Sequence, residues 1–381
     1  VGAERFVENA LEALLERDVG ITLYTREWPQ TKLALIEPSI IDPFYIGSLW
    51  RDWGFQRGVC KAVGEARLDL VQSHERLTCC DIYRAGDGVH AVWLEERLKG
   101  RSALARLAVR LDPHHRYLLD MERRMFRSPW LSAVICNSAM VRDEIRERFG
   151  VAESKLHVIY NAVDCDAFTP ADAAARAAAR VQLNVPADAT VFVLVGSGFE
   201  RKGVATAIRA MDGLPASTYL LVVGADKHLR QHAQLARTLG LRGRVNIAGP
   251  QLDPKAYYTA ADAFVLPSIY DPCPNAALEA MACGLPVVTT VKSGAAEIVR
   301  EHDAGLVADA RDTDAVRAHM QALLDPVTRL RMGANARRAM LPLSSSAMTL
   351  KLVLLYKELL AASVAQRRPV VAKAPAPRAA G

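Results

Sequence analysis

The sequence lacks any Cys-x-x-Cys pair, and its seven cysteines are an odd number. Without paired spacing, neither a disulfide framework nor a zinc site is predicted. Free thiols fit a reducing compartment, so we expect the cysteines to be small core residues. A continuous apolar run of about 18 residues is also missing, which argues against a membrane-spanning helix, and no signal peptide is recognisable. These absences predict a cytoplasmic protein, or one that attaches peripherally to a membrane.

Aromatic side chains make up only 6% of the chain, although 51% of its residues are hydrophobic. This composition is typical of a globular protein, and 381 residues exceed a single core of ordinary size. We therefore expect two domains. The net charge is small as well, at +6, so the local distribution of charge is more informative than the total.

The most informative stretch is residues 191–204 (VFVLVGSGFERKGV), an apolar run that ends in a glycine-spaced turn. The run predicts a buried parallel strand, and the turn at Gly196 carries Arg201 and Lys202 into a helix. In open α/β sheets, ligands bind beyond the carboxyl ends of strands, where helix N–H groups favour anions. Because Arg201 occupies the third glycine position, the turn is not a dinucleotide fingerprint. It predicts a diphosphate site; the alternative is a solvated basic pair, which the dipole of a helix start disfavours.

Strand-like runs alternate with helical stretches, which predicts two doubly wound parallel sheets with a ligand site between them. A helix is expected over residues 3–17, before the first strand-like run ITLYT. We therefore expect that a preceding strand and half of a glycine turn are missing from this sequence. The predicted parts are an N-terminal Rossmann-like domain (1–167), a donor domain (168–345), a helix returning to the first domain (346–366) and a disordered tail (367–381).

Two carboxylates stand out in residues 270–290 (YDPCPNAALEAMACGLPVVTT). A helix is predicted over 276–283, after Asn275, so Asp271 precedes it and Glu279 lies about one turn inside. Both side chains can face the space between the domains, where carboxylates accept hydrogen bonds from sugar or ribose hydroxyls. The alternative for Asp271 is compensation of the helix N-terminus.

Basic residues are concentrated between Trp93 and Trp130, with nine Lys or Arg from Arg97 to Arg127 against three acids. Apolar residues at helical spacing lie among them: Leu104, Leu107, Ala108 and Leu111. A basic amphipathic helix with bordering aromatics predicts contact with an anionic membrane surface through residues 93–130. The alternative is a solvated helix face packed on its own domain. No nucleic-acid recognition module is visible, so no nucleic-acid partner is expected.

The order of FERKG, YDPCPNAALEAMACGLPVV and SGAAEIV resembles the retaining nucleotide-sugar glycosyltransferases of family 4. GAERF at the start and YRAGDGVH in the first domain extend the resemblance over nearly the whole chain. Within that family the chain most resembles the enzymes that add glucose in α-1,3 linkage to heptose of the lipopolysaccharide core. The resemblance implies an α/β protein of the GT-B fold, with two doubly wound Rossmann-like domains facing a cleft.

The resemblance also implies roles in the second domain. Arg201 and Lys202 would hold the nucleotide diphosphate, and Glu279 would bind the ribose. Asp271 stands where the family usually has Glu. It would touch the transferred sugar with a side chain that is one methylene shorter. Backbone groups of the two loops would contact the donor at Gly196, Asn275, Ala276 and Ala277.

In the first domain, Asp87 matches the acidic residue near the reacting anomeric carbon, and His90 lies close enough to compete for that role. Gly2 matches the glycine loop that approaches the diphosphate, and Arg5 matches the family position after that loop. Because the family has no firmly established protein nucleophile, we expect front-face attack, in which the leaving phosphate accepts the proton of the acceptor.

Further candidates for the donor site are Asn137, Ser138 and Glu297. For Ser138 the equal alternative is a helix cap, and for Glu297 the alternative is a carboxylate that merely favours a helix N-terminus. An Asp-x-Asp pattern at Asp164 and Asp166 binds a divalent metal in other glycosyltransferases. Here it resembles the turn with which family 4 leaves the first domain, so we expect no metal and no cofactor.

The sequence thus predicts a peripheral enzyme on the inner face of the cytoplasmic membrane. It would move a hexose, expected to be glucose, from a UDP-linked or other nucleotide sugar to a glycolipid acceptor. Two alternatives stay open. A nucleotide-sugar epimerase of related architecture would need no lipid acceptor, and an inactive nucleotide-sugar-binding scaffold would bind the donor without turnover.

Overall fold

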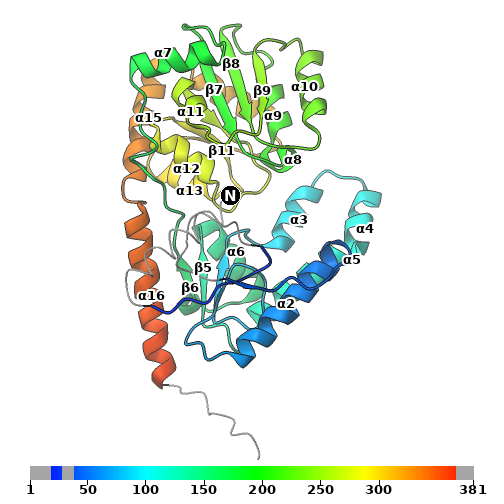
Figure 1. Ribbon diagram of the computed structural model, residues 1–381. Helices are drawn as coiled ribbons and strands as arrows, with labels where there is room; N and C mark the ends of the chain where they lie inside the picture. The colour runs from blue at the N-terminus through cyan, green and yellow to red at the C-terminus, as the bar shows by residue number, and fades with distance from the viewer. Residues whose placement is uncertain (1–18, 28–37, 366–381) are drawn as a thin grey trace, which may run out of the picture.

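The computed structural model describes residues 19–27 and 38–365, which form two α/β domains (Figure 1). The second domain, at the top of Figure 1, contains a six-stranded parallel sheet in the order β12-β11-β10-β7-β8-β9. Its strands are β7 (Thr190–Val195), β8 (Thr218–Val223), β9 (Val245–Gly249), β10 (Ala263–Val265), β11 (Val287–Thr290) and β12 (Gly305–Ala308). The apolar runs that predicted β7, β8, β10 and β11 are largely buried, as expected for a parallel sheet covered on its faces, whereas the run of the edge strand β9 is mostly half-buried.

The helices of this domain pack against one another in pairs, α7 with α11, α9 with α14 and α12 with α15. Each strand of the sheet is followed by at least one of these helices, which gives the alternation seen in the sequence. Their bounds are α7 (Ala173–Gln182), α8 (Phe199–Lys202), α9 (Val204–Ala210), α10 (Leu229–Thr238), α11 (Lys255–Ala260), α12 (Asn275–Ala282), α13 (Ala295–Glu301), α14 (Thr313–Ala322) and α15 (Pro326–Met340).

The first domain contains a four-stranded parallel sheet in the order β3-β4-β5-β6. Its strands are β3 (Gln72–Ser73), β4 (Ile82–Ala85), β5 (Ala133–Cys136) and β6 (Leu156–Val158). Its helices are α2 (Gly47–Glu65), α3 (His90–Leu98), α4 (Ala103–Leu111), α5 (Pro113–Phe126), α6 (Ala139–Phe149) and the 3-10 turn η1 (Glu153–Lys155). A local signal sets the ends of α6, because Ser138 caps its N-terminus and Gly150 ends it with a φ of 66°.

The last helix, α16 (Ser345–Ala365), runs from the second domain down along the first (Figure 1). Met348, Leu352 and Leu355 pack against Ile82 and Ile135 of the first sheet. No single helix among the described residues is long and apolar enough to cross a membrane. The pair α15 and α16, bent by 41° between Pro326–Met340 and Ser345–Ala362, reaches that length and composition only when taken together.

The predicted fold class is confirmed, since both domains are Rossmann-like with parallel sheets. The run ITLYT contributes a shorter strand than expected, because β1 covers only Tyr24–Thr25. It pairs with β2 (Ser39–Ile40) in a separate two-stranded sheet. The helix predicted over 3–17 and the tail over 367–381 lie outside the described residues.

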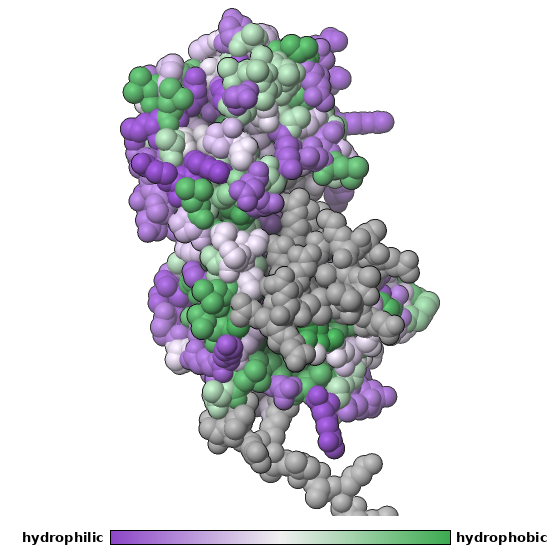
Figure 2. All heavy atoms as spheres, turned by 60° about the vertical axis from the view of Figure 1, so that its left-hand side comes forward, coloured by the Kyte–Doolittle hydropathy of each residue, from purple (hydrophilic) through white to green (hydrophobic). Residues whose placement is uncertain are grey.

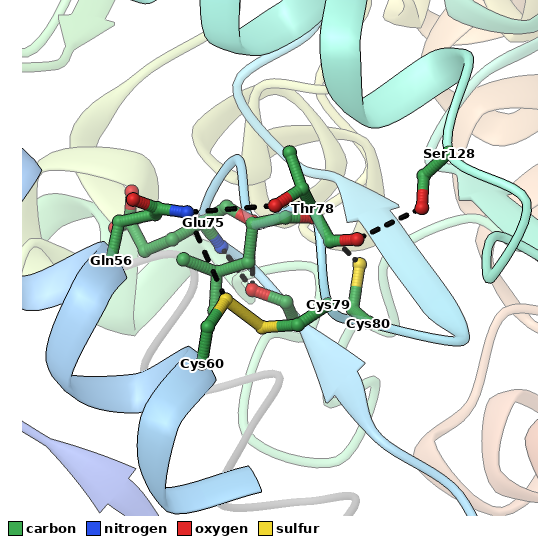
Figure 3. The surroundings of a disulfide bond; sticks show 9 residues. Gln56, Cys60, Glu75, Thr78, Cys79, Cys80 and Ser128 are labelled. Carbon is green, nitrogen blue, oxygen red and sulfur yellow. Dashed lines mark hydrogen bonds between the residues drawn. A yellow bond between two sulfur atoms is a disulfide. The ribbon is translucent and has the colours of Figure 1, made fainter. Parts of the chain in front are cut away.

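One sequence-based expectation is wrong, because Cys60 and Cys79 form a disulfide with their Cα atoms 5.6 Å apart (Figure 3). Cys60 lies on α2 and Cys79 in the segment that leads into β4. The remaining cysteines are free and at least partly buried, as predicted for small core residues: Cys80, Cys136, Cys165, Cys273 and Cys283. The spacing of 19 residues matches no local motif. The two thiols meet only because α2 packs against the segment that contains Cys79. The cysteines therefore do not by themselves indicate a reducing compartment.

We expect the disulfide to stabilise the first domain measurably. Opening a loop of this size gives the unfolded chain entropy worth about 3 kcal/mol in the chain-entropy model. Addition of reductant should therefore lower the urea midpoint of the wild type and leave a Cys60→Ala/Cys79→Ala variant unchanged. A wild-type midpoint that does not respond to reductant, with seven titratable thiols before reduction, would contradict the bond.

Candidate active site

The carboxyl ends of β7 and β10 form a topological switch point in the second sheet. Strand β7 lies between β10 and β8, so the connections after β7 and β10 leave the sheet in different directions. Ligands of open α/β sheets bind at such a point. Arg201 and Lys202 follow β7, on the short helix α8, and Asp271 follows β10. The basic pair and one of the predicted carboxylates therefore meet at the switch point.

Lys202 and Asp271 form a buried ion pair, with Nζ and Oδ2 2.5 Å apart. Lys202 is 8% exposed and Asp271 4%. A guanidinium nitrogen of Arg201 lies 3.6 Å from the other carboxylate oxygen, and the Ser268 hydroxyl lies 3.3 Å from Oδ2. Arg201 and Lys202 occupy the last turn of α8, where the helix dipole favours cations, and not a helix start as the sequence suggested.

Gly196 makes room for this lysine. A Cβ atom at position 196 would lie 3.0 Å from Cε of Lys202 and 3.2 Å from its Cγ and Cδ. The Gly196 N–H donates to the carbonyl of Val223 on β8. The turn after β7 is thus fixed to the neighbouring strand while the lysine chain passes over it.

Glu279 lies on α12, which begins directly after Pro274. Its carboxylate is buried, and its Oε2 lies 2.9 Å from the Tyr258 hydroxyl. The same hydroxyl lies 3.3 Å from the Ala276 carbonyl. The single hydroxyl proton favours the charged and closer acceptor. Ala277, a predicted donor contact, lies on the same helix and is fully buried with its backbone, so it presents no group to a ligand.

Asn161 of the first domain connects this helix to the first sheet. Its amide nitrogen donates to Oδ1 of Asn275 at 2.7 Å and to the carbonyl of Cys273 at 3.3 Å. Its own Oδ1 accepts a 2.6 Å hydrogen bond from the buried guanidinium of Arg84, which lies on β4. The first turn of α12 is therefore held by the other domain.

Asp87 is exposed in the loop after β4, and Tyr270 of the second domain holds that loop in place. The Val89 N–H donates to the Tyr270 hydroxyl at 2.8 Å. This approach requires Gly88, because a Cβ at position 88 would lie 2.2 Å from the same hydroxyl. The first-domain loop that carries Asp87 thus lies beside the second-domain loop that carries Asp271.

The Tyr270 hydroxyl in turn donates to Glu144 of α6 at 2.9 Å, and Lys292 pairs with that carboxylate at 2.8 Å. Burial raises the pKa of Glu144, while the hydrogen bond and charge of Lys292 oppose the rise. Burial raises the pKa of Tyr270 well above its usual value, so the phenol remains a hydrogen-bond donor. This chain of contacts fixes the Asp87 loop through neutral and paired groups.

His90 begins α3, where its backbone N–H donates to Glu122 at 2.8 Å. Its Nε2 lies 3.2 Å from Nδ1 of His115. Burial first, and then the charge of Arg76, lowers the pKa of His90 to about 3. The imidazole is therefore neutral near pH 7, where it can exchange hydrogen bonds but carries no charge.

Ser138 and Glu297 both lie at the N-terminus of α6. The Ser138 hydroxyl accepts from Val141 N–H. Glu297, from α13 of the second domain, accepts from the N–H groups of Ala139 at 2.8 Å and Met140 at 3.0 Å. Glu297 thus compensates a helix N-terminus, as one of its two interpretations held, but the helix belongs to the opposite domain.

Asn137 lies one residue earlier, where its amide nitrogen donates to the Gly86 carbonyl at 3.0 Å. Its Oδ1 is buried and has no hydrogen-bond partner among the described residues. Gly2 and Arg5 lie outside the described residues. In the Asp-x-Asp pattern, Asp164 accepts from the N–H groups of Asp166 and Ala167 in a local turn. No group of three or more His, Cys, Asp or Glu suited to a metal occurs in the described ranges.

The sequence did not single out Tyr270, Glu144, Asn161 or Lys292. A signal existed for Glu144, which interrupts the buried stripe of α6 between Val141 and Ile145. A carboxylate at such a position needs a buried partner. No sequence pattern identifies that partner, because Tyr270 lies 126 residues away along the chain.

Replacing Lys202 by Met should destabilise the second domain by about 3 kcal/mol, because the Asp271 carboxylate would stay buried without its closest cation. Urea unfolding measures the loss. The exposed Lys227→Met is the matched control, and the variant Lys202→Met/Asp271→Asn should lose less than Lys202→Met alone. Equal midpoints for the two single lysine variants would refute the role of the pair.

Two family profiles match the chain and divide it between them. Residues 1–167 match Glycosyltransferase Family 4, and residues 175–339 match Glycosyl transferases group 1. The lipopolysaccharide core biosynthesis glycosyltransferase LpsE of Rhizobium meliloti is 28% identical over 348 residues, 89% of this chain and 90% of that protein. The D-inositol 3-phosphate glycosyltransferase of Xylanimonas cellulosilytica is 31% identical over 217 residues, 54% of this chain and 52% of that protein.

Solved structures share the arrangement of both domains. WaaG, a glycosyltransferase involved in lipopolysaccharide biosynthesis, superposes with a TM-score of 0.79 at 22% identity, over 92% of this chain and 95% of its own. Anabaena HepE in complex with UDP and glucose gives 0.70 at 19% identity, over 94% and 96% of the two chains. At these identities the likeness establishes the fold, while the two profiles establish the family. The chain belongs to the glycosyltransferases of the GT-B fold, with a family 4 domain followed by a group 1 domain.

Proposed function

We propose that this glycosyltransferase is a retaining hexosyltransferase of lipopolysaccharide core assembly or of another glycolipid. The donor would be a nucleotide sugar, with UDP-glucose as our first expectation. The carrying observation is the meeting of Arg201, Lys202 and Asp271 at the switch point of the second sheet. The relative LpsE, named for lipopolysaccharide core biosynthesis, supports the acceptor class, and the HepE complex with UDP and glucose supports the donor class.

The two cations differ in what they can do for a diphosphate. Lys202 is buried and held by Asp271, so it acts as a fixed positive charge. Arg201 is 39% exposed in its side chain and lies 3.6 Å from the same carboxylate, so its guanidinium can turn to a phosphate. Cations placed in advance stabilise the charge that develops on a departing nucleoside diphosphate without reorganising during the reaction.

The carboxylates suit the sugar and the ribose. A carboxylate has about four acceptor positions, so Asp271 can bind Lys202 and still accept a hydroxyl of the transferred sugar. Glu279 accepts a hydrogen bond from Tyr258, and a ribose hydroxyl would be a further donor to its carboxylate. Asp87 is exposed on the facing loop, where it can stabilise positive charge at the anomeric carbon. The acceptor hydroxyl would attack on the side of the leaving phosphate, which takes its proton.

We also propose contact with the inner face of an anionic cytoplasmic membrane through α4. Leu104, Leu107 and Leu111 share one face of this helix and are 80%, 50% and 62% exposed. The basic residues of the same helix, Arg106 and Arg110, form no ion pair in the described part of the chain. Figure 2 shows hydrophilic and hydrophobic residues intermixed over the face of the second domain that it draws. A basic helix with an exposed leucine face suits the interface of an anionic bilayer.

The donor proposal predicts that Arg201→Ala lowers transfer by about two to three orders of magnitude, because one cation of the leaving group is lost. Calorimetric titration with UDP, GDP and ADP sugars identifies the donor, and an acceptor assay measures transfer. The control is the exposed Arg209→Ala, which should behave like the wild type. Binding of no nucleotide sugar, or equal transfer by both arginine variants, would contradict the proposal. Donor binding with no transfer to any glycolipid would favour the scaffold.

The membrane proposal predicts that Leu104→Ser/Leu107→Ser weakens sedimentation with phosphatidylglycerol vesicles by at least about tenfold, because two leucines no longer enter the apolar region. The matched control is Val327→Ser/Leu330→Ser, two equally exposed apolar residues on α15. If both double variants sediment alike, α4 is not the contact.

A further inference from the structure

A depression of about 640 Å³ lies in the first domain, near the amino-terminal ends of its strands and away from the candidate active site. Its lining residues are Thr78, Asp120, Arg123, Arg124, Arg127, Ser128, Pro129 and Trp130. Thr78 precedes β4 and Trp130 precedes β5, whereas Asp87 and Asn137 follow the same two strands. Because β4 and β5 are parallel and four residues long, roughly 13 Å separates their amino-terminal ends from their carboxyl ends. A molecule bound in the depression would therefore not be the reacting sugar.

The depression is strongly basic for its size. Arg123, Arg124 and Arg127 surround it, and Asp120 is its one acid. Asp120 pairs with Arg124 at 2.8 Å. Arg123 and Arg127 form no ion pair within the described residues, and both are exposed. Two guanidinium groups are thus available to an anion at one site.

The wall that faces these arginines is fixed in advance. The Ser128 hydroxyl donates to the Thr78 carbonyl at 2.8 Å, and Gln56 of α2 donates to the Thr78 hydroxyl at 3.5 Å. Figure 3 shows Gln56 and Ser128 reaching Thr78 from opposite sides, next to the disulfide between Cys60 and Cys79. Because these side chains are already held in place, binding a ligand would cost little additional conformational entropy in the wall.

Trp130 adds an aromatic surface beside the cations. It is 49% exposed, and its backbone N–H donates to the Ser128 hydroxyl at 3.3 Å, which ties it to the same wall. An indole offers a large and rigid contact area at low cost in conformational entropy. The chemistry of the depression is therefore a pair of guanidinium groups, hydroxyls and one aromatic face.

We propose that this depression binds a phosphate-bearing sugar, with the phosphate on Arg123 and Arg127 and the ring against Trp130. Guanidinium groups bind phosphate with two parallel hydrogen bonds, and the volume lies in the range of small-molecule sites. Within the proposed function, on which this assignment of the source rests, the phosphorylated sugar would belong to the acceptor glycolipid and the site would anchor it away from the reaction. A phospholipid headgroup shares the phosphate chemistry but has no sugar ring.

The test uses the whole chain carrying Arg201→Ala, so that the proposed donor site does not contribute. Glucose 6-phosphate is titrated while the indole N–H resonance of Trp130, identified with Trp130→Phe, is followed by NMR. We expect a saturable shift, and an affinity at least about tenfold lower after Arg123→Ala/Arg127→Ala, since two charge-assisted hydrogen bonds are lost. The matched control Arg237→Ala/Arg242→Ala, two exposed arginines of the second domain, should bind as before.

Comparison ligands separate the possible sources. Glucose and inorganic phosphate should each shift the resonance only at much higher concentration, because each supplies half of the contacts. Absence of a shift with glucose 6-phosphate, an unchanged affinity in the Arg123/Arg127 variant, or a shift only with phosphatidylglycerol vesicles would overturn the proposal. Since donor transfer in the presence of Arg201 is measured separately, failure here and failure of the proposed function remain distinguishable.

Discussion

The buried ion pair between Lys202 and Asp271 joins the two loops on which the candidate site is built. One loop follows β7 and the other β10, on either side of the switch point. The backbone of Asp271 fixes its loop as well. Its carbonyl accepts a hydrogen bond from the Gly294 N–H, and its N–H donates to the Lys292 carbonyl. A cation buried beside its carboxylate keeps its charge at a fixed place. The second domain can therefore present positive charge to a diphosphate before any ligand arrives.

The same loop couples the second domain to the first. Tyr270, next to Asp271, binds Val89 and Glu144, and Asn275, a few residues later, binds Asn161. Glu297 adds a third connection, because it caps α6. All three connections lie near the carboxyl ends of the strands in the two sheets. The loop that carries Asp271 and the loop that carries Asp87 are thus joined through short, buried hydrogen bonds.

Much of the fold could be predicted because parallel strands leave continuous apolar runs, as in VFVLV and YLLVV, each followed by a glycine turn. The location of Arg201 and Lys202 after β7 follows from that same local pattern. Their partner could not be predicted, because Lys202 and Asp271 are 69 residues apart and nothing local specifies a 2.5 Å contact. The need for glycine at position 88 is likewise invisible without Tyr270, 182 residues further on. The disulfide was missed for the same reason, since its geometry depends on the packing of α2 and not on cysteine spacing.

The basic segment shows how an average over many residues conceals separate surfaces. Arg97 and Arg101 pair with Glu200 of α8, so part of the charge connects the domains. Trp93 is half-buried against the first-domain core, which leaves Trp130 as the exposed flanking aromatic. Within α5, Arg123 of the depression lies ten residues after Pro113, which places it roughly 15 Å along the axis from the end of the helix that adjoins α4. Charge that the sequence presents as one membrane-binding segment is thus divided among an interdomain contact, a leucine-bearing helix and a preformed depression, and each has a different physical requirement.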